Sequence, residues 1–412
     1  MSLSRTVGQV SGPCRHNQLV ERDLIEARAG ASSLACPKAG CACHPHRSTD
    51  GRFTVTDPLL EVTGGVDTHK ETHVAAALDG LGRLLGTEAF PATPAGYGQL
   101  LGWLRGLGEL AAVGVEGTGA WGAGLARHLT ARGVEVVEVQ RPNRQHRRRY
   151  GKSDPADAIG AARAVQAREA AGAPKAGNGN VECIRLLQVA RRSAMKARTQ
   201  AANQMHAVVT TAPELLRADL TGLDTKSLTA RASRFRPGDP TTPTAAARRT
   251  LRILGRRWLA LSIDIDELDK DLDQLTATTA PTLRNLPSVG PQNASALLVA
   301  AGDNPDRLDT EASYAALCGS SPIDASSGRQ HRHRLNRGGD RQANAALYMI
   351  VVSRLRWHHP TQAYMQRRLA DGKTRKEIMR CLKRYVARQV HRAIASDLCL
   401  HQPRSAPVEL TA

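Results

Sequence analysis

Aromatic side chains are scarce in this chain: Phe, Trp and Tyr together make up 3% of its 412 residues. Long apolar runs are also missing, and none approaches the roughly 20 residues that a membrane-spanning helix needs. The first residues contain no apolar segment of the kind that a signal peptide carries. These absences exclude an integral membrane protein, and we expect no membrane partner.

A regular disulfide framework is absent as well. Four of the eight cysteines stand alone in helical or core-like patterns, as buried cysteines do in a reducing compartment: Cys183, Cys318, Cys381 and Cys399. The other four, Cys14, Cys36, Cys41 and Cys43, fall within residues 1–60, which show no periodicity. We interpret residues 1–60 as a disordered extension. A zinc knuckle is the alternative, although the spacing matches no closed four-ligand pattern.

Acidic residues are too few to balance the basic ones. The chain has 57 Lys and Arg against 38 Asp and Glu, a net charge of +19. A surplus of this size repels itself in a compact protein unless a polyanion covers the surface. Nucleic acid is therefore the predicted partner, and a cytoplasmic, nucleoid-associated location follows.

Residues 61–171 are predicted to form an α/β domain. Apolar runs and helical spacing predict the elements, with Asp79 and Gly80 as a hairpin turn. The strands are expected at 62–66, 72–78, 83–90, 111–115 and 134–139, and the helices at 96–107, 120–132 and 155–170. A basic loop over 143–152 precedes the last helix. Strands that alternate with helices in this way form a layered α/β domain.

The rest of the chain is predicted to be mainly helical. After a glycine-rich linker, residues 181–278 are expected to form a coiled-coil arm, with helical patterns at 181–216 and 245–275 and a loop over 217–244. Residues 281–375 are expected to form a small domain in which 286–302 suits a helix-hairpin-helix, or a plain helical turn. A helix is also expected at 345–354, and residues 376–412 are interpreted as a basic helical tail.

Four acids occupy positions where a metal site can form. Asp67 and Glu116 end predicted strands, and Asp154 and Asp157 open a predicted helix. Converging carboxylates repel one another unless divalent cations neutralise them. The alternative for the second pair is structural, since Asp154 before Pro155 is typical of a helix N-cap and Asp157 suits the helix dipole.

The segments Gly65–Lys70, Val115–Gly119 and Lys152–Ala158 together resemble the DEDD transposases of the IS110 group of insertion sequences. The resemblance implies an RNase H-like (RuvC-like) N-terminal domain. It further implies that Asp67, Glu116, Asp154 and Asp157 form a catalytic tetrad that holds Mg²⁺, with two ions per site. His69 and Lys70 also match, and either contact phosphate or stabilise the end of the strand.

A second motif follows in the C-terminal domain, where Ser326, Ser327 and Gly328 precede a basic stretch. The resemblance implies a serine nucleophile here, with Ser327 as the first candidate and Ser326 as the second. The alternative is an ordinary turn, for which these residue types are typical. The predicted phosphate-binding residues are Lys152, Arg329, Arg332, Arg334, Arg337 and Arg341. Gly338 and Gly339 either let the backbone approach a phosphate or turn the chain.

We interpret the chain as an enzyme, a transposase that cuts and rejoins DNA. The resemblance also implies a guide RNA encoded by the element, and a homo-oligomer, dimer or tetramer, in which one protomer's serine completes another's carboxylate site. Base pairing with the guide RNA then selects the DNA sequence, and the protein binds the nucleic-acid backbone. Two alternatives stay open: a structure-specific endonuclease of the Holliday-junction type, and an inactive nucleic-acid-binding remnant.

Overall fold

The computed structural model describes residues 61–139, 153–170, 172–304, 308, 310–329 and 333–401. Several sequence predictions lie outside the described residues: the extension 1–60 with its cysteines, the basic loop over 143–152 with Lys152, Arg332, and the tail beyond residue 401.

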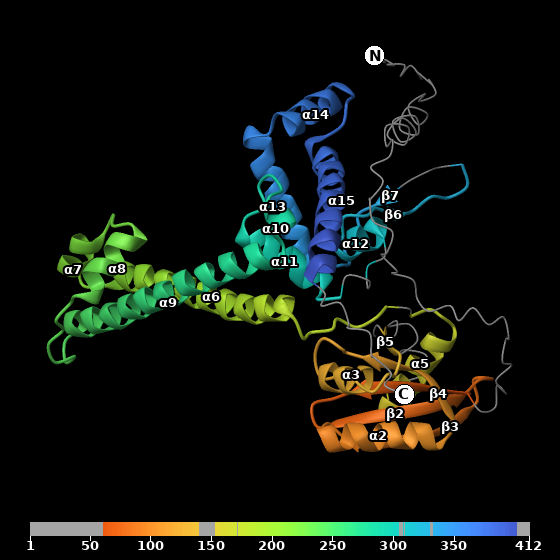
Figure 1. Cartoon of the computed structure of the whole chain (residues 1–412). Helices are drawn as coiled ribbons and strands as arrows, with labels where there is room; N and C mark the ends of the chain where they lie inside the picture. The colour runs from red at the N-terminus through yellow and green to blue at the C-terminus, as the bar shows by residue number, and fades with distance from the viewer. Residues whose placement is uncertain are drawn as a thin grey trace, which may run out of the picture. The chain divides into compact units, whose positions relative to one another are not determined.

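The N-terminal part of the described chain is built on a mixed five-stranded sheet (Figure 1). Its strands are β1 (Glu61–Thr68), β2 (Thr72–Asp79), β3 (Leu84–Pro91), β4 (Glu109–Glu116) and β5 (Val136–Val139). The spatial order is β3-β2-β1-β4-β5, so β1 lies at the centre. β1 pairs antiparallel with β2 and parallel with β4, and β4 pairs parallel with β5. All five predicted strands are confirmed to within a few residues.

Helices cover both faces of this sheet. A side chain at position 64 would touch Leu104 of α2 (Pro94–Gly106), whereas one at position 65 would meet the backbone of α5 (Asp154–Gln166). Consecutive strand residues point to opposite faces, so α2 and α5 lie on opposite sides. α3 (Ala123–Thr130) shares the core of α2, where Leu125 and Leu129 are fully buried. The predicted helices are confirmed, and α3 is shorter than expected.

Two long helices follow, α6 (Asn180–Thr211) and α9 (Pro243–Thr279), and they pack along each other (Figure 1). The prediction of a loop over 217–244 is wrong in part. α7 (Glu214–Leu220) reaches into that range, and α8 (Thr225–Ser233) lies within it. Asp224 caps α8 through a hydrogen bond from the Ser227 N–H, and Leu228 packs into a core with α6 and α9. The helix was not predicted because the surrounding Pro, Thr and Arg residues are typical of a loop.

The remainder is mainly helical and shares one apolar core. It contains α10 (Pro281–Arg284), α11 (Pro291–Ala301), α12 (Glu311–Leu317), α13 (Arg341–Trp357), α14 (His359–Ala370) and α15 (Arg375–His401), with a small hairpin of β6 (Ile323–Asp324) and β7 (His333–Arg334). α13 begins earlier than predicted because Asp340 caps it by accepting from two backbone N–H groups. Among the described residues, no helix is long and apolar enough to cross a membrane.

Candidate functional site

Asp67 and Glu116 end two neighbouring parallel strands. Val66 pairs with Val115 across β1 and β4, so the two acids occupy the next position on each strand and share one face of the sheet. Both are buried, with 6% and 7% of their surface exposed. The Thr68 hydroxyl donates to the backbone carbonyl of Glu116 at 2.8 Å, which ties the two strand ends together.

Helix α5 lies directly against this face because two glycines leave room for it. A Cβ at Gly65 would stand 2.2 Å from the carbonyl oxygen of Ala158, and one at Gly114 would stand 2.8 Å from that of Ala161. Each glycine precedes an acid by two residues, so glycine and acid point to the same side. The close approach of α5 therefore brings its first turn to the edge where Asp67 and Glu116 lie.

The first turn of α5 carries the other two acids. Asp157 is buried on the side of the helix that also buries Ala158 and Ala161, whereas the side chain of Asp154 is 46% exposed. The helix cap is Ser153, whose hydroxyl accepts from the Ala156 N–H at 3.4 Å. The alternative that Asp154 is the N-cap is therefore wrong, and its carboxylate is not occupied in capping.

His69 lies between two of the acids. Its Nδ1 is 3.8 Å from Asp67 Oδ2, and its Nε2 is 3.9 Å from Asp154 Oδ1. One ligand atom from each of these three residues lies within 4.8 Å of the others. The backbone N–H of His69 donates to the Thr72 carbonyl and closes the turn after β1. His69 was expected to contact phosphate or to stabilise the end of the strand, and its position beside the two carboxylates was not predicted from the sequence.

The predicted serines lie in the loop after β6. The Ser326 hydroxyl and backbone N–H both donate to Asp324 Oδ1, at 2.5 and 2.8 Å. These hydrogen bonds lower the pKa of the Asp324 carboxyl below its usual value. Ser327 is exposed and precedes Gly328, whose φ of 55° is left-handed. The loop thus presents two adjacent hydroxyls, and Ser326 has a carboxylate acceptor.

Partly buried hydrogen bonds hold the two ends of the segment that contains this loop. Asn344 donates from Nδ2 to the carbonyls of Cys318 and Gly319, at 2.7 and 3.2 Å, and accepts from Lys383 Nζ at 2.9 Å. Gly339 has a φ of 83°, and a Cβ there would stand 2.5 Å from the Leu317 carbonyl oxygen. Gly339 therefore turns the chain against its own backbone. Lys383 was missed because it lies 39 residues from Asn344.

The described members of the basic stretch are solvent-exposed. They are Arg329, Arg334, Arg337 and Arg341. Arg341 is also the first residue of α13. Exposed guanidinium groups without a fixed carboxylate partner are available to phosphates. Within the described residues, none of these four arginines forms an ion pair.

Comparison with known proteins places two parts of the chain in one family. A profile of DEDD transposases of the IS110 type, described as "Transposase", matches residues 64–212. A profile described as "Transposase IS116/IS110/IS902 family" matches residues 280–366. The chain is also 32% identical over 106 residues to the "Insertion element IS110 uncharacterized 43.6 kDa protein" of Streptomyces coelicolor. That alignment covers 26% of this chain and 26% of the relative.

Proposed function

Because this chain belongs to the IS110 family of DEDD transposases, we propose that it cuts and rejoins DNA as the transposase of an insertion sequence. The observation that supports this most is that Asp67 and Glu116 end neighbouring strands on the face against which α5 packs, and that the first turn of α5 carries Asp154 and Asp157. The strand order, with β1 between an antiparallel and a parallel neighbour, supports an RNase H-like (RuvC-like) fold.

The residues at this edge fit divalent metal ions. Asp67 and Asp154 bring carboxylate oxygens within 4.8 Å of one another, which is a hard donor pair suited to Mg²⁺. We propose that they hold Mg²⁺ together with Glu116 and Asp157. When bound, two Mg²⁺ ions neutralise the carboxylates and stabilise charge on the attacking and leaving oxygens of a phosphodiester. Asp67, Glu116 and Asp157 are buried, which restricts the positions that their carboxylates can take.

The proposed nucleophile is a serine of the 326–327 pair, with Ser327 as the first candidate. Its Oγ forms a bond to phosphorus as the bond from phosphorus to one sugar oxygen breaks, and the departing oxygen takes a proton. The serine proton passes to a base, because a serine hydroxyl is a poor nucleophile at neutral pH. A sugar hydroxyl of another strand then reverses the step and releases the serine. The phosphoester conserves the bond energy, so no nucleotide cofactor is needed.

The exposed arginines of the basic stretch are proposed to bind DNA backbone. We also propose a homo-oligomer and a guide RNA encoded by the element, as the family resemblance implies. The net charge of +19 supports binding to nucleic-acid phosphates.

The test is a covalent protein–DNA adduct. The full chain is incubated with Mg²⁺ and DNA spanning the ends of its element, in the presence of RNA transcribed from the adjacent non-coding region, and adducts are separated on denaturing gels. We expect Asp67→Asn to abolish the adduct while DNA affinity stays within about two-fold. Of Ser326→Ala and Ser327→Ala, only one should abolish it, and Ser321→Ala should leave it intact as the control.

The other outcomes decide against the proposal. If both serine variants still cleave DNA without any adduct, the chain is a structure-specific endonuclease that uses water. If no variant and no metal concentration changes the DNA at all, the chain is a nucleic-acid-binding remnant.

A further inference from the structure

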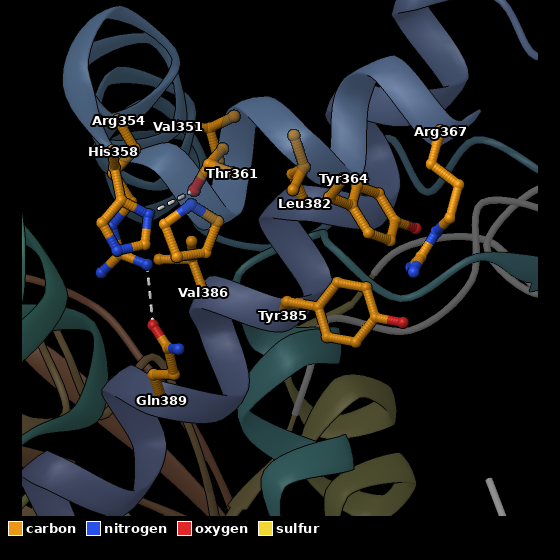
Figure 2. A pocket seen from close by; sticks show the side chains of 11 residues that line it. Val351, Arg354, His358, Thr361, Tyr364, Arg367, Leu382, Tyr385, Val386 and Gln389 are labelled. Atoms are coloured by element: carbon orange, nitrogen blue, oxygen red, sulfur yellow. Dashed lines mark hydrogen bonds between the residues drawn. The ribbon is translucent and has the colours of Figure 1, made fainter. Parts of the chain in front are cut away.

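A cavity of about 370 Å³ lies between α13, α14 and α15, and none of the residues that line it belongs to either motif (Figure 2). Val351, Leu382 and Val386 give the cavity an apolar floor. Ligand pockets occupy roughly 300–1,000 Å³. This cavity is at the small end of that range and suits one nucleotide-sized group.

Arg354 is the unusual residue in this wall. Only 4% of its surface is exposed, and it lines both this cavity and a neighbouring one of about 350 Å³. Its Nε donates to the Pro287 carbonyl at 2.9 Å and its Nη1 to Gln389 Oε1 at 2.7 Å. Its Nη2 is buried and has no hydrogen-bond partner within the part of the chain that the structure describes. A buried guanidinium with one unsatisfied donor edge calls for an anionic or carbonyl acceptor.

The cavity has no acid to supply that acceptor. The residues that line either cavity include no Asp or Glu, whereas Arg367, His358 and Arg392 add to Arg354. The His358 Nδ1 and the Thr361 hydroxyl form a side-chain hydrogen bond at 2.8 Å. The lining is thus basic without an internal counter-ion, which favours an external anion over a buried salt bridge.

Two tyrosines give the cavity an aromatic side. Tyr364 and Tyr385 lie 5.5 Å apart between ring centroids with an edge-on angle of 76°. Figure 2 shows them across the cavity from Arg354 and His358. Tyr385 is 49% exposed, and Arg388 lies over its ring at 6.0 Å from the centroid, so a base would stack on Tyr385 beside or in place of this guanidinium. Aromatic rings next to basic side chains are the combination that binds unpaired nucleotides.

We propose that this cavity binds one unpaired nucleotide, with its base stacked on Tyr385 and its phosphate held by Arg354 and Arg367. The inference rests on the proposed function, because that function makes nucleic acid the partner. It goes beyond it by assigning a subsite for an extruded or single-stranded nucleotide that is separate from the carboxylates and the serine loop. The shared chemistry is a base with a phosphodiester, which a DNA strand or an RNA strand can supply.

The experiment is photo-crosslinking of the full chain to single-stranded 12-mers of deoxythymidylate and of uridylate, each with 5-iodouracil at one position. We expect a crosslink at Tyr385 or Tyr364, located by mass spectrometry, and the 12-mer that gives it identifies the strand type. Anisotropy titration should show at least about a five-fold weaker affinity for Tyr385→Ala and for Arg367→Gln. Tyr385→Phe keeps the ring and should bind like the wild type.

Matched controls lie on α13. Tyr348 is also 49% exposed but does not line the cavity, so Tyr348→Ala should bind normally. Arg356→Gln removes the same charge as Arg367→Gln from another exposed position. Equal losses for test and control variants would overturn the inference, as would crosslinks confined to other residues. If these occur while the serine adduct still forms, the proposed function stands and only the subsite fails. A Tyr385 crosslink without any serine adduct would support the subsite and overturn the proposed function.

Discussion

Replacing Gly65 by alanine is expected to damage the carboxylate site without removing any carboxylate. The new Cβ would stand 2.2 Å from the Ala158 carbonyl oxygen and 2.3 Å from the Ala162 nitrogen. Both atoms belong to the backbone of α5, so no side chain can rotate away to relieve the contact. The helix must therefore move away from β1 as a unit.

The required movement can be estimated from the same geometry. Cβ contacts under 3.0 Å are essentially never seen, so α5 has to shift by at least about 0.8 Å. Overpacking of this kind costs roughly 1–3 kcal/mol. Catalytic groups generally have to be held within about 0.5 Å of the productive geometry. A misplacement of about 1 Å can cost 10²-fold in rate, because Asp154 and Asp157 move with the helix.

The assay measures the melting temperature and the adduct yield of the full chain. Gly65→Ala should lower the Tm by several degrees and reduce formation of the Mg²⁺-dependent adduct about 100-fold. Gly160→Ala is the control in the same helix, since a Cβ there meets nothing within 4 Å, and it should stabilise the chain by roughly 0.5–1 kcal/mol. A Gly65→Ala chain with the Tm and adduct yield of the wild type would refute the claim that α5 contacts the sheet here.

Three further predictions concern stability and metal binding. Burial lowers the pKa of His73, whose ring nitrogens have no partner among the described residues, so the unfolded chain binds the extra proton and stability falls as the pH drops below about 6.5. His73→Phe should keep the stacking on Tyr97 and flatten that loss in urea unfolding between pH 7.5 and 5.5; an unchanged slope would argue against it. Asp397→Ala removes the acceptor of the Thr282 and Leu283 N–H groups and should cost about 1.5–3 kcal/mol in chemical unfolding, whereas an unchanged midpoint would show that these bonds contribute nothing. His69→Ala should weaken the binding of Zn²⁺ more than that of Mg²⁺ in calorimetric titration, because imidazole suits Zn²⁺ whereas Mg²⁺ prefers oxygen ligands; equal losses for the two ions would argue against His69 as a ligand.

The sequence predicted the elements of the sheet well because their periodicity is strong. Val62, Val66, Val113 and Val115 are buried in the strands where apolar runs placed them. The loop predicted over 217–244 failed for the opposite reason. α8 has nine residues with few apolar positions, and its Asp224 cap and its packing against α6 and α9 stabilise a helix that local periodicity does not predict.

For the candidate site as well, the sequence predicted some features and missed others. Motif positions predicted which acids to consider, and their placement at strand and helix ends followed from local pattern. The position of His69 between Asp67 and Asp154 did not follow, because it depends on how closely α5 approaches β1. The hydrogen bond that Lys383 donates to Asn344 from another helix could not be predicted from local spacing either. Contacts between distant elements carry this information, and periodicity within one element does not.

One local signal did exist for the approach of α5. Gly65 stands two residues before Asp67 on β1, and Gly114 stands two residues before Glu116 on β4. The alternation of a strand puts each glycine on the same face as its acid, one pleat deeper into the sheet. Small residues on α5, Ala158 and Ala161, meet them there. A glycine-x-acid pattern at the ends of adjacent parallel strands therefore predicts more than two carboxylates: it predicts a helix packed closely enough to add acids from its own first turn.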